Sequence, residues 1–221
     1  MNDWRESKKL LVSGCSVTHG AELHHPFMST ENIRRSFSQK LADKLNCQLV
    51  NVALSAASNE YIFHSLVDLI ANVYLYQEIH SILVVWTSDT RMTWKCNDTT
   101  YIIHPSFATA LEDVYKKPHV IRDKKSMYIS ADTNHLAGDL SRSITFFTRH
   151  VIDPVELAKK RLHYELCLKT LCDQNNIRLI QCHVSDFEKF GTWAEEGRHP
   201  NADEHEKIAD VIYKGYYDCI L

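Results

Sequence analysis

Apolar runs and amphipathic stretches alternate along this 221-residue chain. The continuous apolar run at 10–12 and the apolar run contained in 79–86 are typical of strands buried on both faces of a sheet, and the stretches 47–52 and 177–182 indicate two more strands. Between them, apolar residues recur at helical spacing, which predicts helices over 31–45, 59–76, 153–175 and 202–217. Strands that alternate with helices favour parallel β-α-β units with right-handed crossovers, so we expect an α/β fold.

The region 91–150 breaks this alternation. It is rich in aromatic and polar residues and has poor periodicity, and a structureless loop of that length is unusual in a compact domain. We expect an insertion with a short helix near 106–115 and some extended pieces, within one domain that spans 1–221. Because it follows the third strand, the insertion would be a lid or specificity wall, or alternatively a surface elaboration or oligomer contact.

Composition narrows the class of protein. A net charge of −3 and a pI near 6.5 give no reason to expect nucleic acid or an anionic membrane as a partner. Seven cysteines without a CxxC pair favour free thiols in a reducing compartment. The charged N-terminus precedes an apolar run too short for a signal peptide or a membrane span. We therefore expect a cytoplasmic protein.

The first candidate site is the polar turn after the first strand, where Ser16 follows Gly14 and Cys15. Open α/β sheets bind ligands at the carboxyl edge, so a serine at this point would present its hydroxyl there. The alternative is a serine-rich turn that caps the next helix. Cys15 is either a reactive thiol or, as we favour, a small buried packing residue.

The second candidate site is a loop near the C-terminus, where Glu196 lies three residues before His199. A carboxylate at that spacing can hold one imidazole nitrogen while the other accepts a proton from a hydroxyl, which is what a serine nucleophile requires. The alternative is that Pro200 and Asn201 begin the last helix, with Asn201 and Glu204 as cap partners.

Taken together, these motifs resemble the SGNH (GDSL-like) hydrolase family over nearly the whole chain. The resemblance rests on the residues 14–18, 51–59, 86–89 and 196–201, and His205 matches a histidine common in that family's closing helix. It implies a three-layer α/β/α sandwich with a mostly parallel, flavodoxin-like sheet. It also implies Ser16 as the nucleophile, His199 as the base and Glu196 as the acid.

The chain departs from the family pattern in several places. Glu196 and Cys15 stand where the family usually has Asp, and Ala56 stands where a glycine N–H helps to bind the oxyanion. The family's G-x-N-D motif is here Trp-Thr-Ser-Asp at 86–89, so its asparagine donor is absent. Losing one such donor costs on the order of 10²–10³ in rate. The candidate oxyanion and substrate-binding residues are therefore Ala56, Thr87, Ser88 and Asn59.

The sequence thus predicts a serine acyl-ester hydrolase of the esterase or deacetylase type, with small O-acyl substrates, acylated carbohydrates among them, and with no cofactor or metal. A hypothesis from another class is a binding or scaffold protein that keeps the frame with weak or no catalysis. A third is a metal hydrolase that uses histidines from the loops at this edge, although their spacing is not that of a metal site. Those histidines are His19, His24, His25 and His199.

Overall fold

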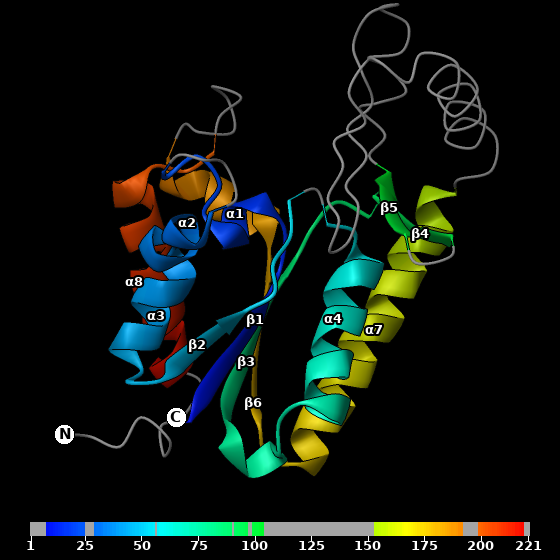
Figure 1. The fold of residues 1–221 in the computed structure, drawn as a ribbon, viewed down its shortest axis with the longest axis horizontal. Helices are drawn as coiled ribbons and strands as arrows, with labels where there is room; N and C mark the ends of the chain where they lie inside the picture. The colour runs from blue at the N-terminus through cyan, green and yellow to red at the C-terminus, as the bar shows by residue number, and fades with distance from the viewer. Residues whose placement is uncertain are drawn as a thin grey trace, which may run out of the picture.

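A four-stranded parallel sheet organises the chain (Figure 1). The computed structural model describes residues 8–24, 29–55, 57–89, 91–96, 99–103, 153–191 and 199–218. The strands are β1 (Lys9–Ser13), β2 (Gln48–Asn51), β3 (Ile79–Trp86) and β6 (Arg178–His183). They lie in the order β2-β1-β3-β6, and every neighbouring pair is parallel. This confirms the α/β class and the flavodoxin-like order of the sheet.

The two apolar runs form the two central strands. In β1 the side chains of Leu10, Leu11 and Val12 are fully buried, and β3 is buried at almost every position. Strands covered by helices on both faces need apolar residues on both, which is why these runs do not alternate. Each large apolar side chain so buried stabilises the fold by about 1.5–3 kcal/mol.

Helices cover both faces of the sheet, as the three-layer prediction requires (Figure 1). The helices α2 (Thr30–Arg35), α3 (Phe37–Lys44) and α8 (Ala202–Asp218) lie on one side. The helices α4 (Asn59–Asn72) and α7 (Pro154–Gln174) lie on the other. None of the helices in the described ranges is both long and apolar enough to cross a membrane.

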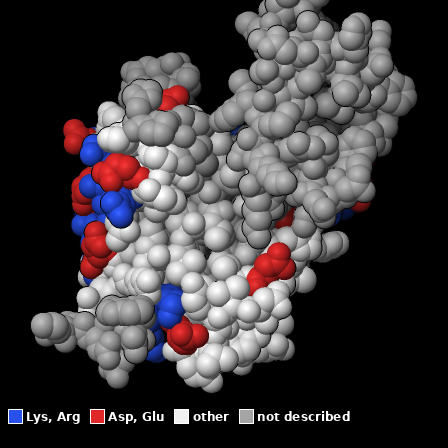
Figure 2. Space-filling view, viewed as in Figure 1, with Lys and Arg blue, Asp and Glu red and all other residues white. Residues whose placement is uncertain are grey.

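Ion pairs and ring contacts join the helices within each layer. Lys40 on α3 pairs with Glu206 on α8 at 2.5 Å, and Lys44 pairs with Asp210 at 2.9 Å. Figure 2 shows acidic and basic side chains interleaved along this side of the molecule. In the other layer, the rings of Phe63 on α4 and Tyr164 on α7 stack with centroids 4.4 Å apart.

The starts of α4 and α7 follow from local capping. The Ser58 hydroxyl accepts a hydrogen bond from the N–H of Tyr61, and the Asp153 carboxylate accepts one from the N–H of Val155. Pro154 occupies the first turn of α7, where its missing N–H costs nothing. The predicted helix 153–175 is confirmed. The predicted helix 59–76 is too long, because α4 ends at Asn72 and a separate 3-10 turn (Tyr76–Glu78) leads into β3.

The prediction of one helix over 31–45 is wrong, because the structure has two helices separated at Ser36. Ser36 adopts an extended conformation (ψ 162°), and its hydroxyl donates to the carbonyl of Ile33. This break frees the N–H of Phe37, which donates to Nδ1 of His205 at 3.0 Å. A contact with a residue 168 positions away therefore overrides the local helical pattern.

The insertion leaves the carboxyl end of β3, as expected. Its first part is an antiparallel hairpin formed by β4 (Met92–Cys96) and β5 (Thr99–Ile103), which confirms that it contains extended pieces. The predicted short helix at 106–115 lies outside the described residues.

Candidate active site

Ser16 follows the carboxyl end of β1 and is the first residue of helix α1 (Ser16–His19). The side chain is 8% exposed. Gly14 is required by this turn, because a Cβ at that position would lie 2.1 Å from Oγ1 of Thr18. The helix ends at Gly20, whose left-handed backbone (φ 82°) lets its N–H reach the carbonyls of Ser16 and Val17.

Cys15 is the N-cap residue of α1 and makes no side-chain cap bond. The alternative interpretation, in which a serine of this turn caps the next helix, is therefore wrong for α1: Ser16 lies inside it. Cys15 is 1% exposed and belongs to the apolar core. This confirms the expected packing role of Cys15.

His199 lies two residues before Asn201, the cap residue of α8. The Asn201 side chain accepts hydrogen bonds from the N–H groups of Asp203 and Glu204, both at 3.0 Å. In return the Glu204 carboxylate accepts from the N–H of Asn201 at 2.7 Å. This reciprocal arrangement is a capping box, so the predicted cap partners are confirmed. It holds the chain rigidly two residues after His199.

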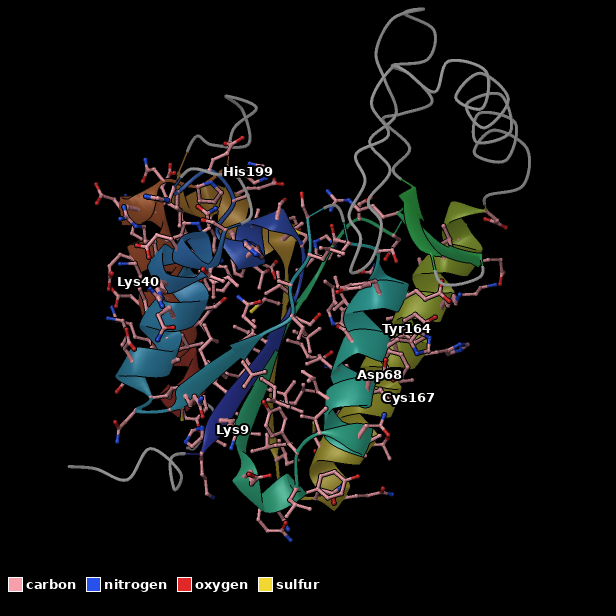
Figure 3. All side chains as sticks on the ribbon, in the orientation of Figure 1. Lys9, Lys40, Asp68, Tyr164, Cys167 and His199 are labelled. Atoms are coloured by element: carbon pink, nitrogen blue, oxygen red, sulfur yellow. The ribbon has the colours of Figure 1, made fainter. Side chains whose placement is uncertain are left out.

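His199 contacts a carboxylate that the sequence did not single out. Its backbone N–H donates to Oε2 of Glu22 at 3.1 Å, and its Nδ1 lies 3.2 Å from the same oxygen. Glu22 follows α1 by three residues, and the N–H of Ala21 donates to the carbonyl of Ser16 at 3.0 Å. Figure 3 shows His199 at the end of the molecule opposite Lys9, where β1 begins. The structure thus brings His199 to the edge at which β1 ends.

Glu196, the predicted acid, and Ala56, a predicted oxyanion donor, both lie outside the described residues. Of the remaining predicted donors, Asn59 is tied to the loop after β3. Its Oδ1 accepts from the N–H of Thr87 at 2.8 Å, and its Nδ2 donates to the carbonyl of Thr87 and to Asp89 at 3.0 and 2.9 Å. These contacts fasten the start of α4 to the segment that contains Thr87 and Ser88.

Several buried polar atoms at this edge have no hydrogen-bond partner among the described residues. They include Oγ1 of Thr18, Oγ1 of Thr87, and Nε and Nη1 of Arg91. Thr18 follows β1, and the other two follow β3, so all lie after the two adjacent central strands. Buried polar atoms are normally paired, and such exceptions need an explanation such as a site for a ligand. Sequence reasoning missed Arg91 because no motif contains it.

Two histidines near the site are held neutral by burial. Burial lowers the pKa of His19 to about 4 and the pKa of His205 to about 3. His205 uses Nδ1 to accept the N–H of Phe37, and its ring stacks on the Phe37 ring with centroids 5.6 Å apart. Its contacts therefore join α8 to α3. The histidine that the family resemblance singled out thus has a packing role in this chain.

The metal-site hypothesis gains no support from the described part of the chain. Within it, no three His, Cys, Asp or Glu side chains are grouped so that they could hold a metal ion. His25, one of the four histidines in that hypothesis, lies outside the described residues.

Comparison with known proteins gives matches at the level of structure. The sequence matches no family model and no curated protein. A G-D-S-L family lipolytic protein from Desulfitobacterium hafniense DCB-2 is 13% identical, with 94% of this chain and 98% of that chain covered and a TM-score of 0.39. A carbohydrate esterase is 10% identical, with 95% and 68% covered and a TM-score of 0.41. The psychrotrophic esterase EstA from Pseudoalteromonas sp. is 15% identical, with 96% of each chain covered and a TM-score of 0.37.

These matches include the family that the sequence motifs resemble. The sequence identities and TM-scores are low, so the chemistry of this chain has to be argued from its own residues.

Proposed function

We propose that this protein is a serine acyl-ester hydrolase in which Ser16 is the nucleophile and His199 the general base. The observation that carries the proposal is the contact between His199 and Glu22, because Glu22 belongs to the same short segment as Ser16. A hydroxyl at the carboxyl end of a central strand and an imidazole at the same edge are the two groups that acyl transfer needs.

The reaction would proceed by nucleophilic catalysis. The Ser16 hydroxyl attacks the ester carbonyl carbon while His199 accepts its proton, and His199 then protonates the leaving alcohol. Water, deprotonated by His199, hydrolyses the resulting acyl-serine. The N–H of Ser16 is a suitable oxyanion donor, since the first N–H groups of a helix have no intrahelical acceptor. Ala56, Thr87 and Ser88 remain the predicted further donors.

The unpartnered groups after β3 support a polar substrate. The hydroxyl of Thr87 and the guanidinium of Arg91 are buried and lack a partner among the described residues. Both can donate hydrogen bonds to oxygen atoms. Small O-acyl compounds, acylated carbohydrates among them, offer such oxygens next to the ester. Glu196 remains the sequence-predicted acid of this site.

A second candidate function is a binding or scaffold protein with the same frame. One observation favours it: the amide hydrogens of Asn59 are already donated to Thr87 and Asp89, so this side chain does not replace the donor missing from 86–89. On this hypothesis the site would bind an acyl compound without turning it over.

A fluorophosphonate probe and p-nitrophenyl acetate separate the two candidates. We expect the probe to label Ser16, and Ser16→Ala and His199→Ala to abolish both labelling and turnover. Ser185→Ala and His163→Ala are matched controls at exposed positions, and both should behave as the parent protein. A folded parent protein that is neither labelled nor active would exclude the hydrolase and favour the binding protein.

A further inference from the structure

We propose that Arg161 on α7 is a positioning residue of the candidate active site, because it holds the loop 87–89 in place by acting through Asp89. This inference rests on the proposed function and deepens it, since the loop contains Thr87 and Ser88, two of the predicted oxyanion and substrate-binding residues. Arg161 itself would contact neither the substrate nor the reacting atoms. It belongs to none of the sequence motifs, and it lies 72 positions from Asp89.

The Arg161 guanidinium is held between two carboxylates. Its Nε donates to Oδ1 of Asp89 at 2.7 Å, and its Nη1 donates to Oε1 of Glu165, one turn further along α7. The three side chains are 22%, 24% and 23% exposed, so solvent and salt screen these contacts less than they screen pairs on the open surface. A planar guanidinium that donates from two of its nitrogens is fixed in direction as well as in position. The helix therefore presents a rigid cation to Asp89.

Asp89 transmits this contact to Asn59, the first residue of α4. The oxygen that accepts from Arg161 also accepts from Nδ2 of Asn59 at 2.9 Å. A carboxylate can only accept, so it favours the orientation of the Asn59 amide in which Nδ2 is directed at Asp89. In that orientation Oδ1 of Asn59 accepts the N–H of Thr87 at 2.8 Å, and Nδ2 also donates to the Thr87 carbonyl at 3.0 Å. The carboxylate thus supports both backbone contacts of Thr87.

A second side chain holds the same carbonyl. Nε2 of His183, at the end of β6, lies 3.0 Å from the carbonyl oxygen of Thr87. Because a carbonyl oxygen can only accept, this contact requires the proton of the neutral ring to be on Nε2. Thr87 is therefore fixed from α4, from β6 and, through Asp89, from α7. Donors that stabilise a developing oxyanion are effective only when their directions are fixed before the reaction, which is what such a network provides.

The neighbouring ion pair has a different role and provides a matched reference. Lys160, the residue before Arg161, pairs with Glu60, the residue after Asn59, at 3.2 Å. This pair joins α7 to α4 within their layer (Figure 1). Arg161 instead reaches beyond α4 to the loop that follows β3. Substitutions at 160 and 161 therefore disturb the same two helices, whereas only the second removes the contact with Asp89.

The test compares Arg161→Gln with Lys160→Gln by amide hydrogen exchange of Thr87 and by kinetics with p-nitrophenyl acetate. We expect Arg161→Gln to speed the exchange of the Thr87 N–H at least about tenfold, because the loop opens locally. It should also lower kcat about tenfold with little change in KM, since oriented donors act chiefly in the transition state. Lys160→Gln should leave both quantities as in the parent protein. Arg161→Lys, which keeps the charge without the planar fork, should recover part of both losses.

A double-mutant cycle tests whether Arg161 acts through Asp89. If it does, the variant that combines Arg161→Gln with Asp89→Ala should lose no more kcat than Asp89→Ala alone. Additive losses would show that Arg161 acts by another route and would overturn the proposal.

Two further results would overturn it. One is an exchange rate of Thr87 in Arg161→Gln equal to that in Lys160→Gln, and the other is an unchanged kcat in Arg161→Gln when the parent protein is active. Circular dichroism verifies that each variant is folded, and if Arg161→Gln is not, Arg161→Lys takes its place in the comparison. The exchange measurement needs no turnover. A folded parent protein that hydrolyses no ester would remove the proposed function, while the exchange of Thr87 would still decide whether Arg161 holds the loop.

Discussion

Polar groups at the amino end of the parallel sheet are paired, whereas several buried ones at its carboxyl end have no partner among the described residues. At the amino end, Lys9 pairs with Glu78 at 3.2 Å, and Glu78 also accepts the N–H of Leu75. Also at this end, the guanidinium of Arg178 lies 3.8 Å from the centre of the Tyr216 ring and donates to the Tyr216 carbonyl. At the carboxyl end, buried polar atoms of Thr18, Thr87 and Arg91 have no hydrogen-bond partner among the described residues, and Glu22 has a left-handed backbone.

This difference indicates that the polar groups at the amino end stabilise the fold, whereas those at the carboxyl end do not all do so. Paired charges and satisfied N–H groups are what stability alone would select. Violations of such local rules are expected at functional sites, where a group is kept ready for a ligand. The contrast therefore indicates function at the carboxyl end, independently of any motif, and the predictions below test it from the largest expected effect to the smallest.

Among substitutions measured at neutral pH, the largest effect should come from Gly14→Ala at the carboxyl end. The added Cβ would lie 2.1 Å from Oγ1 and 2.7 Å from Cβ of Thr18, so the turn that carries Ser16 must shift. We expect a loss of up to about 3 kcal/mol in the free energy of unfolding, as for other overpacked sites, together with a large loss of esterase activity. Urea denaturation and the p-nitrophenyl acetate assay measure the two quantities.

Gly215→Ala is the matched control for this substitution. Its Cβ would meet nothing within 4 Å on α8, so alanine should stabilise the protein by about 0.5–1 kcal/mol through helix propensity. Equal effects of the two substitutions would show that the turn at Gly14 is not specially constrained.

A somewhat smaller effect is expected for Asn59→Ala. The substitution removes the acceptor for the buried N–H of Thr87 and the donor to Asp89. Leaving such a buried group unsatisfied costs about 1–3 kcal/mol, and the loop 87–89 should become mobile. Thermal unfolding and amide hydrogen exchange of Thr87 report these changes. Unaltered exchange at Thr87 would mean that Asn59 does not hold the loop.

The buried histidines at the carboxyl end should make the protein sensitive to acid. The folded-state pKa values of His19 and His205, about 4 and about 3, lie below the ordinary value of 6.5. The unfolded chain therefore binds more protons below pH 6.5, and the stability that these groups contribute is complete above that pH. It should fall by up to about 1.4 kcal/mol per pH unit for each imidazole as the pH drops toward 4.

Urea denaturation at several pH values between 7 and 4.5 measures this slope. His205→Gln, whose amide oxygen can still accept the N–H of Phe37, should reduce the slope, whereas His163→Ala at an exposed position should not. An identical slope in His205→Gln and in the parent protein would contradict the assignment.

The smallest effect is expected at the amino end, for Glu78→Gln. The Glu78 side chain is well exposed, and exposed ion pairs contribute little to stability. The pKa of Glu78 is lowered by its hydrogen bond from the N–H of Leu75 and by Lys9, and glutamine retains an acceptor for that N–H. We expect little change in the thermal midpoint and none in esterase activity. A clear loss of activity would remove the functional contrast between the two ends.

Much of the frame could be predicted from the sequence because its determinants are local. The predicted strand 79–86 has the bounds of β3, since most of it is an apolar run of the kind that is buried on both faces of a sheet. The cap partners Asn201 and Glu204 were also predicted, because they are three residues apart and interact within one turn. Ser16 and His199 were selected as candidates by residue type and by motif.

Other features depend on contacts between distant segments and could not be predicted. The break at Ser36 is stabilised by His205, 168 positions from Phe37, and the contact between Glu22 and His199 spans 177 positions. Neither has a periodic or local signal. Glu196 is predicted as the acid because it is near His199 in the chain, and it lies outside the described residues; Glu22, whose carboxylate accepts the N–H of His199, comes from the other end of the chain.

The sequence by itself determined the four strands of the sheet, the helix 153–175 and the cap of the last helix, because burial patterns and caps act over a few residues. The tertiary structure alone brought the Glu22 carboxylate to His199, and among the described residues it left buried polar atoms after β1 and β3 without a hydrogen-bond partner. Such pairings depend on how the parallel strands are ordered, and that order brings together residues that share no neighbourhood in the chain.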